Sequence, residues 1–376
     1  MNDYPVVVYG ASGYTGMLVM DWLIDQRIPF RAVGRNAERI ESNMRDRVVR
    51  LESATYEIVE CDHEVDALSK AFAGAKVVCN TVGPFRNFGS TGVEAALQAG
   101  CHYLDTTGEQ AHVLDVRDRF DAEFAAAGLV CAPSTSYMYT LAEIAAELAL
   151  ETPGVDMLET GSIGRGPREG SGVTVGSTAS IFELFRSEQY QLWDNELVAH
   201  EPGKGFEISV PEYLEPIFAL PWGGTSLPAF YERDSRVRYC NSLVGFYDMQ
   251  IMRQVAELWK QWESEYKDLP EEQQNAVLEQ LVGAATPSMP PRERTSMQRC
   301  TDFAIGRGPL TSVRATVNSV TPYITTGALQ TAAVEKLLAG DFARPGVTSA
   351  CKAFGHRYLL GYLEQRGLAA ATVMGA

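Results

Sequence analysis

The sequence carries no excess of positive charge and has no long apolar run. Its 32 lysines and arginines are outnumbered by 48 aspartates and glutamates, which gives a formal net charge of −16. Nucleic-acid-binding proteins present a basic face, so this balance argues against nucleic acid as a partner. No apolar stretch is long enough to cross a bilayer. No basic leader precedes the apolar segment at Val6, so we expect neither a membrane span nor a signal peptide.

Cysteine and histidine patterns typical of metal centres are also missing. None of the seven cysteines occurs in Cys-x-x-Cys spacing, and the five histidines are scattered. Four cysteines, Cys61, Cys79, Cys101 and Cys131, fall in or beside predicted strands, where a free thiol packs as a small apolar residue. We therefore expect a reduced, cytoplasmic protein with neither disulfides nor a metal site.

The length and composition favour two globular domains. The chain has 376 residues, of which 45% are hydrophobic and 21% are charged. These fractions are those of a globular protein, and the length exceeds one ordinary domain.

A glycine-rich segment near the N-terminus is the most informative feature that is present. Residues 6–16 read Val-Val-Val-Tyr-Gly-Ala-Ser-Gly-Tyr-Thr-Gly, an apolar strand followed by a turn and then by an apolar-periodic helix. In a dinucleotide fold such glycines permit the tight turn, the approach of a pyrophosphate and the packing of the helix. The helix N-terminus then faces the anion. The predicted cofactor residues here are Gly10, Ser12, Gly13, Tyr14, Thr15 and Gly16. The alternative is a Rossmann fold that has lost its ligand.

The end of the second predicted strand indicates which dinucleotide binds. After residues 30–33 the chain continues Gly34-Arg35-Asn36, with no acidic residue before Glu38. An acid at this position binds the ribose 2′-hydroxyl of NAD, whereas an arginine accommodates the 2′-phosphate of NADP. The pattern favours NADP, the alternative being that Arg35 is a solvated surface residue.

Strands and helices alternate through the first third of the chain, as in a doubly wound sheet. Further strands are predicted at residues 56–61, 75–80, 101–105 and 129–132. Ligands bind at the carboxyl ends of such strands. We therefore expect Asp62, which follows the third strand, to contact the adenine or its ribose.

The second half of the sequence predicts a domain that contains both strands and helices. Strands are expected at residues 157–163 and 312–320, and helices at about 178–185, 248–262, 271–281 and 351–365. The glycine-rich connection at 164–176 is either a surface loop or a second phosphate cradle. The helices near 248–282 are either core or an insertion that serves as an arm or lid.

Three further motifs carry a family resemblance. Asn-Thr-Val-Gly-Pro-Phe at 80–85, with Gly89 after it, and Tyr-Leu-Asp-Thr-Thr-Gly-Glu at 103–109 follow the glycine segment in order. The C-terminal part has Tyr-Ile-Thr-Thr-Gly at 323–327 and Arg-Pro-Gly-Val at 344–347. Together these resemble the saccharopine dehydrogenase-like oxidoreductases, which include the trans-acting enoyl reductases. The resemblance is specific over about the first 130 and the last 60 residues.

The resemblance implies an α/β protein with an N-terminal Rossmann NADP-binding domain and a second α+β domain that covers the nicotinamide. We place the first domain at 1–134, the second at 135–345, and a C-terminal helix that returns to the Rossmann domain at 346–376. The family resemblance further implies that the residues from Gly10 to Gly16, together with Arg35, bind the phosphates of the cofactor. Asn80, Thr81, Val82, Gly83 and Pro84 would line the path to the nicotinamide, and Gly108 and Glu109 would border its pocket.

One loop departs from the family. Where relatives carry a Gly-Phe-Asp type turn, this chain has Pro-Ser-Thr-Ser-Tyr-Met-Tyr-Thr at 133–140, before a helix expected from about Leu141. This loop would face the reacting carbon, so substrate or chemistry can differ from the family. Candidate proton donors are Tyr137 and Tyr139 in this loop, and Asp105 and Glu109 after the fifth strand. For each, the alternative is a purely structural role.

The sequence therefore predicts an NADP-dependent reductase that transfers hydride to a C=N or conjugated C=C bond of a bulky metabolite. The alternative is a non-catalytic NADP-binding sensor or scaffold. A third possibility is a substrate carried on an acidic protein, for which Arg165, Arg168, Arg292 and Arg294 would form a basic entrance. A half-buried strand at 312–320 could also pair across a two-fold axis, which makes a homodimer an expectation.

Overall fold

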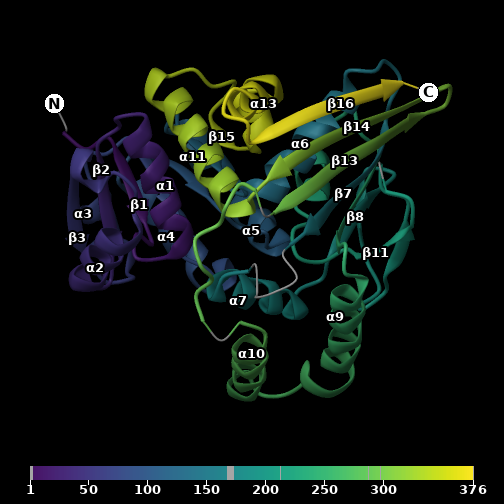
Figure 1. Cartoon of the computed structure of the whole chain (residues 1–376), viewed down its shortest axis with the longest axis horizontal. Helices are drawn as coiled ribbons and strands as arrows, with labels where there is room; N and C mark the ends of the chain where they lie inside the picture. The colour runs from purple at the N-terminus through teal and green to yellow at the C-terminus, as the bar shows by residue number, and fades with distance from the viewer. Residues whose placement is uncertain (1–2, 167–172, 212, 287, 297, 376) are drawn as a thin grey trace. The chain divides into compact units, whose positions relative to one another are not determined.

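The computed structural model describes residues 3–166, 173–211, 213–286, 288–296 and 298–375 (Figure 1). They form two compact units, each described by itself. The first comprises Met1–Thr107, His112–Thr140 and Pro322–Leu363, and the second comprises Gly108–Ala111, Leu141–Thr321 and Glu364–Ala376. Our predicted boundaries at 134 and 345 divide the chain differently, because residues 322–345 belong to the first unit here.

The first unit is built on a parallel sheet of short strands. Among the described residues it has seven strands, in the order β15-β6-β5-β4-β1-β2-β3. The strands are β1 (Val6–Tyr9), β2 (Phe30–Gly34), β3 (Tyr56–Glu60), β4 (Val77–Asn80), β5 (His102–Asp105), β6 (Val130–Ala132) and β15 (Gly346–Val347). Continuous apolar runs such as Val6, Val7 and Val8, all fully buried, are typical of parallel strands covered on both faces.

Helices connect these strands and cover the sheet (Figure 1). They are α1 (Tyr14–Asp25), α2 (Ala37–Arg47), α3 (Val65–Phe72), α4 (Phe85–Gln98), α5 (Gln110–Ala126), α11 (Pro322–Ala339), α12 (Ala350–Phe354) and α13 (His356–Glu364). Helix α6 (Tyr137–Leu150) begins in this unit, and from Leu141 on it belongs to the second unit. Helices α1 and α11 pack closely, because a Cβ on Gly327 would lie only 2.7 Å from the carbonyl oxygen of Leu18. This contact gives the glycine of the 323–327 motif a packing role.

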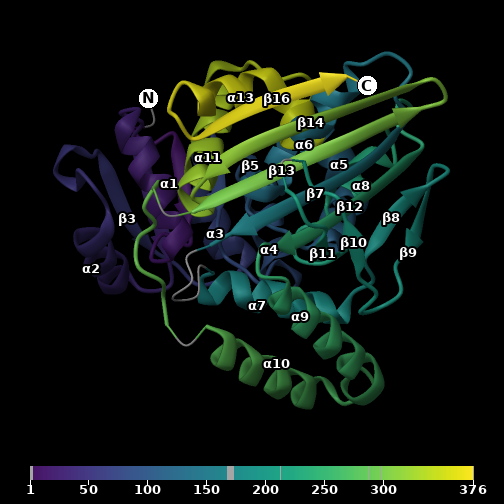
Figure 2. The same ribbon diagram turned by 45° about the vertical axis from the view of Figure 1, so that its right-hand side comes forward.

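The second unit is organised around a mixed sheet. Nine strands within the described ranges make up this sheet, β10-β11-β12-β7-β13-β14-β16 with the β8–β9 hairpin attached to β12. The strands are β7 (Met157–Arg165), β8 (Tyr190–Trp193), β9 (Glu196–Ala199), β10 (Phe206–Ile208), β11 (Ile217–Leu220), β12 (Tyr239–Phe246), β13 (Arg299–Gly308), β14 (Thr311–Val320) and β16 (Ala369–Gly375). Figure 2 shows β13 and β14 as a long antiparallel hairpin with β16 along its outer edge.

The helices of the second unit enclose an aromatic core. They are α7 (Val175–Glu183), α8 (Leu227–Tyr231), α9 (Met249–Gln261) and α10 (Glu271–Ala285), with a π-helical turn at Trp262–Tyr266. The Phe185 ring stacks on Trp222 and on Trp259 at centroid distances of 5.8 and 6.3 Å. The apolar stripe of α9 therefore forms core, and α10 adds the buried Leu278 to the same cluster.

Both units match the predicted fold class, an α/β Rossmann domain followed by a second, α+β domain. Two local predictions were wrong. Helix α6 begins at Tyr137 rather than at Leu141, because the main-chain carbonyl of Ser136 accepts the first helical hydrogen bond, from the Thr140 N–H at 3.0 Å. The predicted helix at 351–365 is broken at Gly355, whose φ is +87°, and residues 369–375 form strand β16.

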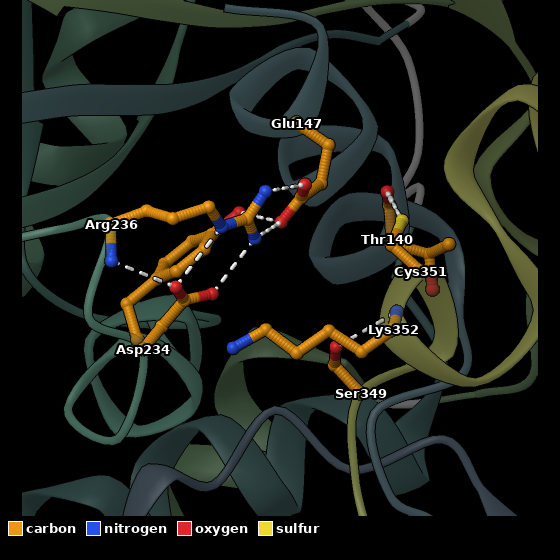
Figure 3. A network of polar contacts seen from close by, with 8 residues as sticks. Thr140, Glu147, Asp234, Arg236, Ser349, Cys351 and Lys352 are labelled. Atoms are coloured by element: carbon orange, nitrogen blue, oxygen red, sulfur yellow. Dashed lines mark hydrogen bonds and ion pairs between the residues drawn. The ribbon is translucent and has the colours of Figure 1, made fainter. Parts of the chain in front are cut away.

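A polar network ties α6 to the chain that follows α8 (Figure 3). The Arg236 guanidinium donates to both carboxylate oxygens of Glu147, at 2.9 and 2.8 Å, and also to Asp234. The Tyr231 hydroxyl donates to Glu147 at 3.0 Å. These hydrogen bonds raise the pKa of Arg236 and compensate the buried carboxylate of Glu147. The network is thus a structural clamp within the second unit.

Candidate functional site

The glycine loop follows β1 and opens helix α1. Gly10 has a φ of +89°, a conformation that residues with a Cβ rarely adopt. A Cβ on Gly16 would lie 2.5 Å from the carbonyl oxygen of Gly10, so the third glycine permits the close packing of the helix. The N-terminus of an α-helix directs its first N–H groups away from the helix, where they can face an anion.

This loop lies at the point where the strand order of the sheet reverses. Strand β1 is flanked by β2 on one side and by β4 on the other, so the loops after β1 and β4 meet. The Thr81 hydroxyl donates to the carbonyl of Tyr9 at 3.0 Å. Ligands of doubly wound sheets bind at such a switch point, so this edge is the candidate cofactor site.

Asn80 shapes the loop after β4. Its side chain is fully buried, accepting from the Val82 N–H at 2.9 Å and donating to the Tyr103 hydroxyl at 2.9 Å. Burial raises the pKa of Tyr103 well above its usual value. Asn80 thus holds Thr81 and Val82 in place, and Val82, Gly83 and Pro84 are half-buried along the same loop.

The loop after β2 carries Arg35 at the surface. Asn36 caps α2 by accepting from the Arg39 N–H at 2.7 Å, so its side chain already has a structural function. The Glu60 carboxylate also accepts from the Ala37 N–H at 2.8 Å. Arg35 itself is exposed and its charge helps to lower the pKa of His63. An exposed guanidinium at this edge suits a ribose phosphate.

His63 and Tyr9 lie side by side near the same edge. The Tyr9 hydroxyl and His63 Nδ1 are 2.6 Å apart, and the two rings are stacked. Burial raises the pKa of Tyr9 and is the larger cause of the lowered pKa of His63. Asp62 is exposed just before His63, at the end of the chain segment that follows β3.

Asp105 stands at the centre of a buried polar cluster at the ends of β5 and β6. Its Oδ1 accepts from the N–H groups of Thr107 at 3.0 Å and Ser134 at 2.9 Å. Its main-chain carbonyl accepts from Nε2 of Gln330 at 3.0 Å, and that amide also donates to the Thr135 carbonyl at 2.7 Å. The loops after β5 and β6 and helix α11 therefore meet at one aspartate.

His112 completes this cluster and escaped the sequence analysis. Its Nε2 lies 3.5 Å from Oδ2 of Asp105, with side-chain exposures of 2% and 0% respectively. A Cβ on Gly89 of α4 would lie 2.3 Å from the imidazole, so this glycine makes room for the ring. The signal available in the sequence was a histidine seven residues after Asp105, on the first turn of the next helix.

The loop at 133–136 holds a strained residue. Ser134 has a φ of +61°, and its hydroxyl is buried without a hydrogen-bond partner. Tyr137, which is buried, follows on α6 and donates its N–H to the Thr326 hydroxyl at 3.1 Å. Tyr139 is half-buried two residues further on. Both tyrosines thus lie on a helix rather than in the predicted loop.

Two predicted residues, Gly108 and Glu109, belong to the second unit. Glu109 is buried. The neighbouring Gln110 holds this segment, since its amide donates to the carbonyls of Tyr190 at 3.0 Å and Thr225 at 2.8 Å.

In the part of the chain that the structure describes, no helix is long and apolar enough to span a membrane. All seven cysteines are free.

Comparison with known proteins places the chain in a family. Residues 140–376 match the model of a family of unknown function, DUF5938. The chain belongs to this family. Residues 10–111 match a model described as NAD(P)H-binding, which covers the glycine loop and the loops after β2 and β4. This match supports a nicotinamide dinucleotide as the cofactor.

Curated relatives match only part of the chain. A putative trans-acting enoyl reductase of Mycobacterium tuberculosis is 28% identical over 229 residues, 57% of this chain and 50% of that protein. The human saccharopine dehydrogenase-like oxidoreductase is 29% identical over 29% of this chain and 28% of its own. A lipid droplet localized protein of Caenorhabditis elegans is 30% identical over 33% and 30%. This chain thus spans at most half the length of these relatives.

The fold has a solved counterpart over its whole length. Apo saccharopine dehydrogenase (L-Glu forming) from Saccharomyces cerevisiae superposes with a TM-score of 0.61 over 99% of both chains, at 12% identity. These comparisons confirm the predicted resemblance to saccharopine dehydrogenase-like oxidoreductases and enoyl reductases. Within residues 10–111 the chain also shares the NAD(P)H-binding domain of that group.

Proposed function

We propose that the protein is an NADPH-dependent reductase that transfers hydride to the conjugated C=C bond of a bulky, carrier-bound acyl chain. The observation that carries the proposal is the glycine loop packed against the β4 loop at the switch point, with Arg35 exposed beside it. The enoyl substrate is favoured over an imine because the putative trans-acting enoyl reductase matches 57% of this chain.

The residues that we propose to hold the cofactor are those predicted above. The glycine loop from Gly10 to Gly16, with the hydroxyls of Ser12 and Thr15, would bind the pyrophosphate. Gly34, Arg35 and Asn36 would surround the 2′-phosphate, with Asp62 at the adenosine. The bound cofactor supplies the hydride, and the protein orients the acceptor and supplies a proton. We propose that this proton is donated, or its transfer assisted, by side chains among the four predicted candidates, Tyr137, Tyr139, Asp105 and Glu109.

A basic end of the second sheet supports a carrier-bound substrate. Arg165 on β7 and Arg299 on β13 are direct register partners, and both are exposed. Arg292 and Arg294 are exposed a few residues before Arg299. Arg168 lies outside the described residues. An acidic carrier protein could bind these arginines despite the negative net charge of the chain.

We also propose that the protein resides in the cytoplasm, where thiols stay reduced, because its seven cysteines are free.

The first test is a titration of wild type and of Arg35→Ala with NADPH and NADH, followed by nicotinamide fluorescence. Loss of a charge-assisted phosphate contact should weaken NADPH binding about 10-fold or more and leave NADH unchanged. Arg45→Ala, at the far end of α2 and exposed, is the matched control and should bind both normally. Equal loss of both cofactors in Arg35→Ala would contradict the choice of NADP.

Turnover distinguishes an enzyme from a sensor or scaffold. NADPH oxidation is measured with the N-acetylcysteamine thioester of trans-2-octenoic acid and with the cyclic imine 2-phenyl-1-pyrroline. We expect oxidation with the thioester. Faster oxidation with the imine would assign the C=N reaction instead. Tight NADPH binding without turnover of either would favour the non-catalytic alternative.

A further inference from the structure

Asp105 and His112 form a buried acid–imidazole pair at the carboxyl edge of the first sheet. The carboxylate oxygen Oδ2 and the ring nitrogen Nε2 lie 3.5 Å apart, and both atoms are buried without a hydrogen-bond partner. Burying two ionisable groups costs free energy unless they serve each other or a ligand. Two apolar side chains would fill this position at a lower cost in free energy, so the presence of an acid and an imidazole here needs an explanation.

The surrounding residues fix both members of the pair. Two main-chain N–H groups, of Thr107 and Ser134, hold Oδ1 of Asp105 and so direct Oδ2 towards the imidazole. The ring of His112 lies over Gly89, where any Cβ would collide with it, and beside Phe85 at a centroid distance of 5.6 Å. Such support from neighbouring atoms is what preorganised functional groups require.

The position of the pair also points to the reacting end of the cofactor. Asp105 is the register partner of Asn80, the residue that shapes the loop after β4. Beside it, Ser134 combines a φ of +61° with a buried hydroxyl that has no partner. Strained backbone and unsatisfied buried atoms gather at functional sites. Arg35, in contrast, marks the adenosine end, on the other side of β1.

We propose that His112 donates the proton of the reduction and that Asp105 is the positioning residue that orients its imidazole. This inference rests on the proposed reductase function. The bound dinucleotide would supply a hydride to the β-carbon, which would leave an enolate. The protonated imidazole of His112 would then give an N–H proton to the α-carbon, and solvent would return a proton to His112. One reduced cofactor and one proton would be consumed for each C=C bond reduced.

The location of His112 is tested without any substrate, by NMR of the imidazole groups in histidine-labelled protein. The five histidines give few signals, and that of His112 is assigned by its absence in His112→Gln. NADP⁺ should shift the His112 signal, whereas adenosine 2′,5′-bisphosphate, which lacks the nicotinamide, should leave it in place. Both ligands should shift His63, which feels the charge of Arg35.

The outcomes separate this inference from the proposed function. If NADP⁺ shifts His63 and leaves His112 unchanged, the cofactor binds and the inference about His112 is wrong. If NADP⁺ shifts no histidine, cofactor binding itself fails and both proposals are overturned. If both ligands shift His112 alike, the ring senses the adenosine end, which also contradicts the proposal.

Kinetics with the octenoyl thioester then test the role of the pair. His112→Gln should lower kcat about 100-fold or more without changing the Kd for NADPH, and added imidazole should restore part of the rate. Asp105→Asn should lower kcat less, and Gly89→Ala, which displaces the ring without removing it, should mimic His112→Gln. His356→Gln is the control and should remain active. Unchanged kcat in His112→Gln would disprove the assignment.

Discussion

His200 in the second unit is a buried histidine outside the candidate site. Its ring is 8% exposed and lies edge-on to Phe206 at 6.0 Å. Its pKa is lowered from the usual 6.5 to about 4, chiefly because burial removes water from the charged form; a hydrogen bond with Asn241 opposes this effect and the charge of Lys204 adds to it. Asp302 on β13 is the opposite case. It is fully buried beside the Ser162 hydroxyl at 2.5 Å, and its pKa is raised well above the usual value.

The lowered pKa of His200 predicts loss of stability in acid. Above pH 6.5 the ring is neutral in both folded and unfolded chains; as the pH falls from 6.5 to 4 only the unfolded chain takes up the proton. This should remove about 3 kcal/mol of unfolding free energy across that window. His200→Asn should lack this step in urea unfolding curves measured between pH 7 and pH 4.

Other acid-sensitive groups act in both proteins, so the comparison is the difference between wild type and variant at each pH. His356→Asn is the control and should keep the wild-type dependence, since His200 is intact. A constant difference between wild type and His200→Asn across the window would show that His200 does not titrate as described.

At the scale of single elements, the glycine loop shows how sequence, turn and helix depend on one another. Gly10 adopts a positive φ at the end of β1, and the absence of a side chain at Gly16 lets α1 pack against the carbonyl oxygen of Gly10. The Asn43 amide of α2 donates to the carbonyl of Ser12 at 2.8 Å, which fixes the middle of the loop. Any side chain at Gly16 must therefore move the loop or the helix.

Gly16→Ala should disturb both stability and cofactor binding. The added methyl would lie 2.5 Å from the Gly10 oxygen, and such overpacking costs about 1–3 kcal/mol. We expect a lower Tm and loss of NADPH binding. Gly361→Ala is the matched control in α13, where a Cβ meets no atom within 4 Å. Helix propensity should make that variant about 0.5–1 kcal/mol more stable. Normal NADPH binding by Gly16→Ala would contradict the assigned role of the loop.

At the scale of the whole molecule, strand β16 bears on assembly. It lies at the end of the second sheet, and no strand of the described residues pairs with its outer edge. Its seven residues, Ala369–Gly375, carry no charge, and Val373 and Met374 are 48% and 47% exposed. Proteins usually protect a free edge with charge, proline or a cover. An uncharged edge can pair with a second copy of itself across a two-fold axis.

We therefore expect a homodimer joined through β16. Light scattering after gel filtration should give twice the chain mass of 41.2 kDa. Val373→Lys should yield the monomer, because two like charges would meet at the joined edge. Val198→Lys places the same charge on β9, at a residue 42% exposed, and should stay dimeric. A monomeric wild type, or a dimeric Val373→Lys, would rule out this interface.

Local patterns in the sequence were sufficient for the Rossmann order of strands and helices, for the glycine loop and for the family resemblance. Apolar runs, glycine spacing and helix signals act over a few residues, so they can be interpreted without knowing what packs against them. Arg35 after β2 and Asp105 after β5 could be singled out for the same reason, because the carboxyl ends of parallel strands must share one edge.

Contacts between distant segments were decided only by the tertiary structure. The structure singles out His112 by its contacts with Asp105 and Gly89. It singles out Ser134 by a backbone conformation that no periodicity in the sequence encodes. At the start of α6 the Tyr137 N–H donates to the Thr326 hydroxyl of α11. The strand at 369–375 depended on pairing with β14, some fifty residues earlier. Such features come from long-range packing and hydrogen bonding, whose partners are set by the whole fold rather than by neighbouring residues.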